Sequence, residues 1–597
     1  MSLNYITEDY RKAINITSDI IINPKRFKQD GKINVIPLET GGGKSSITNL
    51  SLVWLAENDF DNAGTIILKE RTEDCDNAVK QINNLFGKET AMPYHAKLFE
   101  VNGKYSYKKE SRYREMLFKY PILIMTCEGF KNRHKKLGDF VYWTSDKTAV
   151  GMYTAGKSNT RTRLIIDEQP NPAALYQITP KTLMDIENFV QVEGSKSLFN
   201  PISNICEYIR RSCFLRPSTG EHQYWDICDC PISKELNEYF ESKRKRDDIY
   251  DIFVALKLFC LNGGIVSYND NERYKSVTVG KYIDIFDNFF DTIILDGTAR
   301  INSIYDNDNF NIINIPKIKT YSNTKLHICK QLSGSRSELL SNKEIVTAAL
   351  NYACKIVPKN EKCLIVTLKS VKEEFENIGC SNNIIIDHFG NITGTNKYRD
   401  YKYLFMIGIP FLPDSAYKLI YHIYHSNNDK TKPQGVTVSN GVRKLSDPDY
   451  NKTQKSILAV EIVQAINRGV CRNWNNGDTF EAFIFMLNKD EEVISLIQEC
   501  MTDIEIVYND EFYTMLPEIV KEKKPILAVD AVLSTINNHK KFFPGGKASK
   551  KEIFTASPFT EECSKGTITA VWKHPAVKDL EQSGKIKIHT KFIEFLA

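Results

Sequence analysis

The 597-residue sequence lacks the features of membrane-spanning, secreted and strongly charged proteins. It has no run of about 18 apolar residues, which a membrane-spanning helix would need, and its first residues form no basic-then-apolar signal pattern. Neither sign of charge dominates, because 79 lysines and arginines face 74 aspartates and glutamates. A cytoplasmic location without a membrane partner is expected, and a nucleic-acid partner is permitted but not required.

Closely paired cysteines are also scarce, although the chain contains 14 cysteines. Most stand singly, which is not the density or spacing of a disulfide scaffold. One group could be read as a metal site and consists of Cys206, Cys213, Cys228 and Cys230, with His222 between them. Zinc sites usually contain paired C-x-x-C segments, whereas this group has one C-x-C and two isolated cysteines. Reduced, buried thiols are therefore favoured over a zinc or iron–sulfur site, and the role of the group stays open.

Short apolar runs that alternate with helical stretches are abundant. Because the runs are continuously apolar, they predict strands covered on both faces, and the helices between them predict an α/β fold with parallel sheets. Active loops in such folds follow the carboxyl ends of the strands. The runs span residues 34–39, 65–70, 120–127, 163–168, 292–299, 363–368, 403–410 and 482–487.

The first run leads directly into a glycine-rich loop and an amphipathic helix. Glycines allow backbone N–H groups to wrap a phosphate, and the helix N-terminus favours its negative charge. The P-loop pattern predicts that Lys44 reaches the phosphates of ATP and that the hydroxyl of Ser45 binds Mg²⁺. Leu38 stands where the general pattern has glycine. The predicted phosphate-binding segment consists of Thr40, Gly41, Gly42, Gly43, Lys44, Ser45 and Ser46.

A pair of carboxylates ends the run at 163–168. Asp167 is expected to hold Mg²⁺, directly or through water, and Glu168 to polarise the attacking water. A strand ending in Asp-Glu is common by itself, but it becomes specific 123 residues after the P-loop lysine Lys44.

Together with the P-loop, these residues resemble the motifs of superfamily 2 (DEAD/DEAH-like) helicases. ETGGGKS (39–45) resembles motif I, and IIDEQP (165–170) resembles motif II. The remaining matches, in order, are 65–82 to motif Ia, 121–130 to the following Thr-rich loop, 295–300 to motif III, 363–370 to motif IV, 388–410 to motif V and 464–473 to motif VI.

The resemblance implies roles for residues outside the P-loop. Arg468, and with less certainty Arg472, would be arginine fingers that complete the ATP site from the second domain. The nucleic-acid backbone would be contacted by Thr126, Thr395, Asn396 and Lys369. Arg26 and Gln29 could sense the adenine, although a solvated basic turn is an equal alternative.

The motif order implies two tandem RecA-like domains, the first from 1–169 with 291–310 and the second from 311–505. Residues 170–290 form a mainly helical insert between motifs II and III, as in XPD/DinG-type helicases. Those enzymes often carry an iron–sulfur cluster between motifs I and II, where this chain has only Cys75 and Cys127, so a cluster is not expected. The basic runs at 210–211 and 243–246 could contact nucleic acid or be solvated helix faces.

The segment 506–597 is predicted to be a separate small domain of winged-helix type. Lys573, His574, Lys578 and the lysines at 585, 587 and 591 would face a nucleic-acid backbone. Pro575 fits poorly inside a recognition helix, so a protein-docking or purely structural role is an equal alternative.

The expected function is an ATP-dependent helicase or translocase on single-stranded nucleic acid, with DNA favoured over RNA. One alternative is a nucleotide-gated switch or assembly ATPase whose turnover ignores nucleic acid. Another is a module that binds nucleic acid without hydrolysis, which the intact Lys44, Asp167 and Glu168 disfavour. Translocation polarity, pathway and oligomeric state stay open.

Overall fold

The structure is a computed structural model, in which most of the chain is described. The described residues are 7–27, 29, 31–131, 138–144, 159–169, 173–192, 196–215, 223–226, 232–242, 249–268, 275–282, 289–330, 334–392, 394–425, 435–439, 442–473, 478–486, 490–516, 532–533, 535–536, 546–556, 571–572, 575–583 and 585–596. Among them, no helix is long and apolar enough to cross a membrane.

The N-terminal part is built on a seven-stranded parallel sheet. Its order is β15 (Phe310–Ile312), β1 (Ile33–Ile36), β14 (Asp291–Leu295), β9 (Arg163–Asp167), β2 (Thr65–Lys69), β6 (Ile122–Thr126) and β3 (Ala91–Tyr94). Along β9, Ile165 belongs to one hydrophobic core cluster, and Leu164 and Ile166 belong to another. Both faces of the sheet are therefore covered, as the continuous apolar runs predict.

The second part is built on a six-stranded parallel sheet. Its order is β18 (Ile384–His388), β17 (Cys363–Thr367), β19 (Tyr403–Ile407), β22 (Phe480–Met486), β16 (Thr324–Lys330) and β23 (Glu505–Asn509). Each of the eight apolar runs overlaps one strand of the two parallel sheets, so the predicted α/β fold with tandem parallel sheets is confirmed.

The insert has more helical than strand residues among those described, and it also contains an antiparallel sheet that the sequence did not predict. It contains α8 (Pro180–Val192), α9 (Lys196–Ile209), α10 (Lys234–Ser242) and α11 (Tyr250–Asn262). These helices accompany a four-stranded antiparallel sheet of β10 (Ala173–Ile178), β13 (Lys275–Tyr282), β12 (Gly264–Tyr268) and β11 (Gln223–Asp226). Long segments with helices separate β10, β11 and β12 along the chain, so these strands lack the regular hairpin spacing that sequence patterns reveal, and only β12 and β13 follow each other closely.

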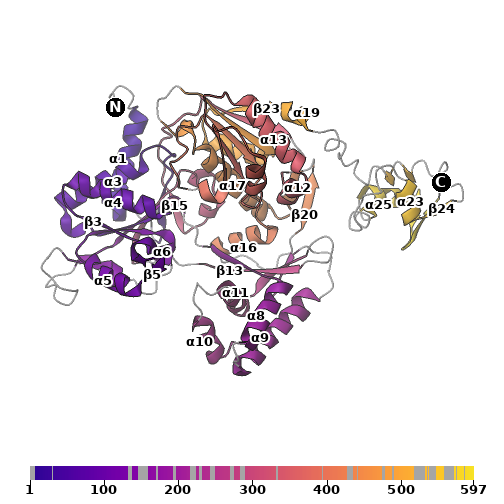
Figure 1. The fold of residues 1–597 in the computed structure, drawn as a ribbon, viewed down its shortest axis with the longest axis horizontal. Helices are drawn as coiled ribbons and strands as arrows, with labels where there is room; N and C mark the ends of the chain where they lie inside the picture. Colours follow the sequence, from indigo (N-terminus) through magenta and orange to yellow (C-terminus); the bar gives the residue numbers. More distant parts are fainter. Residues whose placement is uncertain are drawn as a thin grey trace.

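The insert sheet packs between its own helices and a helix that follows a strand of the second sheet. Helix α11 contacts β10 and β13, while α16 (Asp414–Tyr424) contacts β10, β12 and β13. Figure 1 shows α16 between the insert and the second sheet. The hydroxyls of Thr278 on β13 and Ser415 on α16 form a buried hydrogen bond of 2.8 Å. The insert is therefore attached covalently to the first sheet and by packing to a segment of the second part.

Two predicted boundaries need correction. Strand β15 continues the first sheet to Ile312, beyond residue 310, and β23 continues the second sheet to Asn509, beyond residue 505. Helix α19 (Glu511–Met515) packs on α13 (Lys343–Ile356), with Phe512 fully buried. Residues 506–516 therefore belong to the second part and not to the C-terminal unit.

The C-terminal unit lies apart from the rest of the described chain (Figure 1). It contains α23 (Lys550–Ala556), α25 (Pro575–Gln582) and an antiparallel sheet of β24 (Lys547–Ser549), β26 (Phe592–Phe595) and β25 (Ile586–Ile588). Pro575 is the first residue of α25, where the missing N–H has no helical partner to lose, so the proline is compatible with this helix. Lys573 and His574 lie outside the described residues.

Candidate functional site

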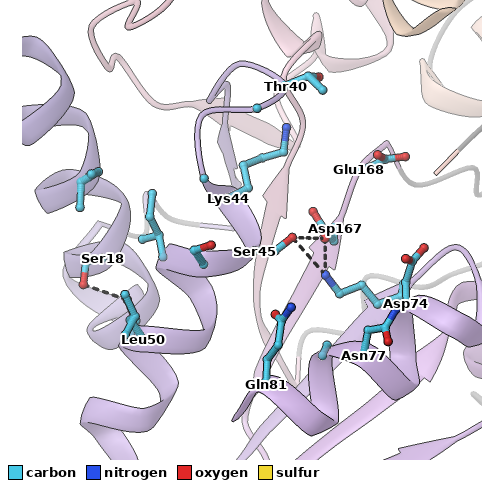
Figure 2. A pocket seen from close by; sticks show the side chains of 18 of the residues that line it. Ser18, Thr40, Lys44, Ser45, Leu50, Asp74, Asn77, Gln81, Asp167 and Glu168 are labelled. Carbon is cyan, nitrogen blue, oxygen red and sulfur yellow. Dashed lines mark hydrogen bonds and ion pairs between the residues drawn. The ribbon is translucent and has the colours of Figure 1, made fainter. Parts of the chain in front are cut away.

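The glycine-rich loop joins β1 to α3 (Lys44–Asn58) at the carboxyl edge of the first sheet. Gly41 and Gly43 have φ angles of 87° and 88°, in the left-handed region that favours glycine. Lys44 Nζ donates a hydrogen bond of 3.1 Å to the carbonyl oxygen of Leu38, so the lysine folds back over the loop. Figure 2 shows this side chain extending into the pocket. Strand β1, the glycine-rich loop and helix α3 therefore follow one another in the predicted order.

Ser45 and Asp167 meet opposite this loop, although they are 122 positions apart. Ser45 Oγ donates a hydrogen bond of 3.3 Å to Asp167 Oδ2 at the end of β9. Lys69 Nζ, from the end of β2, forms an ion pair with the same Asp167 oxygen and lies 3.5 Å from Ser45 Oγ. The oxygens of Ser45 and Asp167 thus both lie beside the Lys69 ammonium. Oxygen atoms of this kind are the ligands that Mg²⁺ prefers.

The neighbouring charge controls the ionisation of Asp167. Burial would raise the pKa of this carboxyl, but the ammonium of Lys69 and the hydrogen bond from it lower the pKa below its usual value. Asp167 is therefore held as a carboxylate, the form that binds a metal ion.

Glu168 leaves the strand in an unusual backbone conformation. Its φ of 78° lies in the left-handed region, although it is not glycine, and its N–H donates to the Leu295 carbonyl at 3.0 Å. Such conformations cost free energy and tend to occur at functional sites. Burial raises the pKa of Glu168, and the positive charge of Arg468 opposes this rise. The Glu168 carboxylate therefore points toward Arg468 of the second part.

Two arginines from the segment after α17 (Pro448–Ile466) approach the site from the second part. Arg468 is 3% exposed, and its Nη2 lies 3.9 Å from Glu168 Oε1. Within the described residues, its Nε and Nη1 are buried without a hydrogen-bond partner. Arg472 lines the same pocket as the glycine-rich loop, and its carbonyl oxygen would lie 2.2 Å from a Cβ built on Gly41. Both arginines therefore approach a loop that belongs to the first sheet.

These residues meet between two tandem α/β parts, each built on a parallel sheet that is covered on both faces. No family model matches the chain, and no curated protein matches it. Among solved structures, S. tokodaii Xpd4 is 12% identical, with 82% of this chain and 99% of that chain covered and a TM-score of 0.47. S. cerevisiae Dbp5 bound to RNA and ADP BeF3 is 10% identical, with 86% of this chain and 97% of that chain covered and a TM-score of 0.36. A DEAD box protein from Methanococcus jannaschii is 11% identical, with 85% of this chain and 98% of that chain covered and a TM-score of 0.26.

The pocket extends beyond the glycine-rich loop to a region between α1 and α3 that the sequence did not predict. This part is lined by Tyr10, Ile14, Ser18, Ile22 and Asn23 from α1 (Glu8–Ile22) and its C-cap, and by Leu50, Ser51, Val53, Trp54 and Glu57 from α3. Tyr10 lies close to the loop, because a Cβ on Gly43 would be 3.5 Å from its hydroxyl. Arg26 and Gln29 are exposed and do not line the pocket, so this structure gives them no contact with a base. A tyrosine in an N-terminal helix carries no motif by which sequence reasoning could find it.

Gly42 and the linker between the two sheets hold the loop from its outer side. A Cβ on Gly42 would lie 2.8 Å from Ile318 Cδ1, and the Ile318 N–H donates to Glu39 Oε1 at 3.2 Å. Lys319 Nζ donates to the Thr40 carbonyl at 3.3 Å, and burial lowers the pKa of Lys319 to about 8. Gly42 therefore faces the linker rather than the pocket, and Ile318 and Lys319 are site neighbours that no motif indicates.

The four residues expected to contact nucleic acid occupy different surroundings. Lys369 is exposed directly after β17, and Thr395 is half-buried in the loop before β19. Thr126 is 9% exposed, and its hydroxyl accepts the Gly129 N–H at 3.1 Å, so it caps α6 (Cys127–Lys131). Asn396 lines the nucleotide pocket, where its Oδ1 accepts a hydrogen bond from Arg472 Nη1.

Among the described residues, no group of three or more histidine, cysteine or carboxylate side chains is arranged around a metal position. Cys206 and Cys213 are buried in the hydrophobic core of the insert, while His222, Cys228 and Cys230 lie outside the described residues. Between the P-loop and Asp167, burial raises the pKa of the Cys75 and Cys127 thiols to about 12.

Of the two basic runs in the insert, the first includes Arg210, which forms an ion pair with Glu187. The second run, at 243–246, lies outside the described residues.

Proposed function

We propose that this chain is an ATP hydrolase of the superfamily 2 helicase type, with an XPD/DinG-like insert between motifs II and III. The observation that carries the proposal is the approach of Arg468 to Glu168 across the junction of the two RecA-like parts. The guanidinium is buried, and two of its nitrogens lack hydrogen-bond partners among the described residues. A buried, partly unpaired arginine beside a phosphate loop fits a group that awaits a phosphate oxygen.

In this proposal, Lys44 and the backbone N–H groups of residues 40–46 bind the phosphates of ATP. Ser45 and Asp167 hold Mg²⁺, which supplies charge neutralisation and positions the phosphates when bound. Glu168 orients the attacking water and accepts its proton. Arg468 stabilises the negative charge that develops on the transferred phosphoryl group. Arg472 and Asn396, which lie in the same pocket, position the nucleotide.

The hydrolysis cycle is proposed to drive stepping along single-stranded nucleic acid, with DNA favoured. Exposed Lys369 and half-buried Thr395 lie in the segments that follow β17 and β18, at the edge where α/β folds bind ligands. Contacts of this type bind the backbone and do not depend on base sequence, which suits translocation. The observed placements of Thr126 and Asn396 give less support to a nucleic-acid role for these two residues.

The test is the ATPase rate of the full chain without nucleic acid, with single-stranded DNA and with RNA. We expect stimulation by single strands, with DNA more effective than RNA. Lys44→Ala should abolish nucleotide binding, and Glu168→Gln should bind ATP with little turnover. Turnover that ignores nucleic acid would favour a nucleotide-gated switch, and near-normal turnover by both variants would refute the site.

A further inference from the structure

The ammonium of Lys69 lies where a metal ion would bind in the proposed ATP site. Its Nζ forms an ion pair with Asp167 Oδ2 and lies 3.5 Å from Ser45 Oγ, so it contacts both proposed Mg²⁺ ligands. Figure 2 shows these interactions as a triangle of dashed lines beside the loop. The side chains of Lys69 and Asp167 are only 10% and 13% exposed. Lys69 lies inside the segment 65–82 that resembles motif Ia, but that resemblance gave this lysine no individual role.

Lys69 and Mg²⁺ compete for one carboxylate oxygen. Mg²⁺ binds its oxygen ligands at about 2.1 Å, so an ion on Asp167 Oδ2 would lie within about 5 Å of an ammonium on that oxygen. Two cations at this separation repel each other strongly where water is largely excluded. The lysine must therefore move before the metal ion can bind directly.

Asp74 is a second anionic partner within the same pocket. It lies in the first turn of α4 (Thr72–Phe86), is half-buried, and lines the pocket together with Lys69 and Asp167. Its negative charge already acts on the Lys69 ammonium. Figure 2 shows Asp74 on the helix beside the triangle. Since a lysine side chain is long and flexible, a change of rotamer is sufficient to exchange one carboxylate for the other.

We propose that Lys69 is a tethered cation that neutralises the metal site of the nucleotide-free protein and passes from Asp167 to Asp74 when Mg²⁺ and nucleotide bind. This inference rests on the proposed function, since it requires a nucleotide at the P-loop. The exchange keeps Asp167 paired at all times. It also sets the Mg²⁺ concentration at which the site fills, because the metal ion must displace an existing ion pair.

The experiment measures binding of a fluorescent ADP analogue to the full chain by anisotropy, at Mg²⁺ concentrations from zero, in EDTA, to saturation. Lys69→Met should lower the Mg²⁺ concentration at half-saturation about tenfold or more, because the competing charge is removed. Asp74→Asn should raise it severalfold, because the lysine loses its second partner. In the Lys69→Met background, Asp74→Asn should have little further effect, since coupled residues are not additive.

Lys97→Met is the matched control, because this exposed lysine pairs with Glu73 in the same turn of α4 and does not contact the metal ligands. It should leave the Mg²⁺ dependence unchanged. A second readout is the melting temperature without nucleotide, which Lys69→Met should lower and saturating Mg²⁺–ADP should restore. Lys69→Gln provides a polar alternative if the methionine variant folds poorly.

An unchanged or increased Mg²⁺ requirement in the Lys69 variants would overturn the inference, as would a full Asp74→Asn effect in the absence of the lysine. If the wild-type chain binds the analogue and only these shifts are missing, the proposed function survives. If the wild-type chain binds no nucleotide at any Mg²⁺ concentration, both the inference and the proposed function fail.

Discussion

At the scale of single residues, the site combines groups that are costly to bury with partners drawn from the opposite part of the chain. Arg468 is 3% exposed and pairs with Glu168, whose φ of 78° is strained. Burial lowers the pKa of Arg468, while the carboxylate of Glu168 opposes this effect. A charge that burial disfavours is retained only where it has a partner or a task.

Arg468→Ala should reduce the ATPase rate by about 10²-fold or more, because the arginine acts on charge that appears in the transition state. Nucleotide affinity should change much less. Arg472→Ala should instead weaken nucleotide binding, since Arg472 lines the pocket and contacts Asn396. Steady-state rates together with equilibrium binding of an ADP analogue separate the two effects. An affinity loss confined to Arg468→Ala would reverse these assignments.

The buried ammonium of Lys319 should make the stability of the folded chain depend on pH. Its pKa is lowered from 10.5 to about 8 by burial, so the unfolded chain binds more protons than the folded chain between these values. The free energy of unfolding should therefore rise with pH in this window, by about 2 kcal/mol relative to Lys319→Met between about pH 7.5 and 10. Denaturation of both proteins across this range measures the difference. A constant gap would show that Lys319 keeps an ordinary pKa.

At the scale of secondary-structure elements, α16 is the element that joins the insert to the rest of the chain. Its side chains contact three strands of the insert sheet, and Tyr424 at its end joins a core cluster of the first sheet. The following helix α17 packs against α16 and also reaches the first part, where Ser456 and Ser303 form a hydrogen bond of 2.7 Å. Relative motion of the two parts would therefore disturb the contacts of α16 and α17.

Ser415→Ala should lower the free energy of unfolding by about 1–3 kcal/mol, because it leaves the buried Thr278 hydroxyl without its partner across the insert junction. Combining it with Thr278→Val should recover part of this loss, since both polar groups are then removed. Thermal unfolding of the two single variants and the double variant measures the coupling. Strictly additive losses would mean that the two hydroxyls do not interact.

At the scale of the whole molecule, the chain divides into a core with two parallel sheets, which ends near residue 516, and a small C-terminal unit. The C-terminal unit has its own hydrophobic cluster, which includes Val532, Ile553, Trp572 and Ile593. Strand β23 and helix α19 belong instead to the core, because β23 pairs with β16 and Phe512 packs with α13. A deletion that begins at residue 506 would remove both elements.

Deleting residues 517–597 should leave a soluble protein with near-normal basal ATPase and weaker binding of single-stranded nucleic acid. Deleting 506–597 should unfold or precipitate the second part, because an edge strand and a buried phenylalanine are lost. Solubility, melting temperature and ATPase rate compare the two truncations. The deletion of 517–597 isolates the loss of the C-terminal unit, and the deletion of 506–597 adds the loss of β23 and α19. Unchanged nucleic-acid affinity and stimulation after the 517–597 deletion would rule out a guiding role for this unit, whereas equal behaviour of both truncations would contradict the corrected boundary.

The sequence by itself determined the elements whose signals are local. Continuous apolar runs located eight strands of the two parallel sheets, because burial on both faces leaves no room for polar alternation. The loop 39–45 and the pair Asp167–Glu168 were found because a phosphate loop and strand-end carboxylates follow directly from residue type and neighbouring pattern.

Only the tertiary structure decided which distant residues meet. The antiparallel insert sheet, the attachment of α16, the place of β23 and the contacts of Tyr10, Lys69 and Lys319 all depend on packing between segments far apart in the chain. A lysine at the end of a buried strand looks like many others in a sequence. Its position between Ser45 and Asp167 exists because three parallel strands and a helix N-terminus converge at one edge of the sheet.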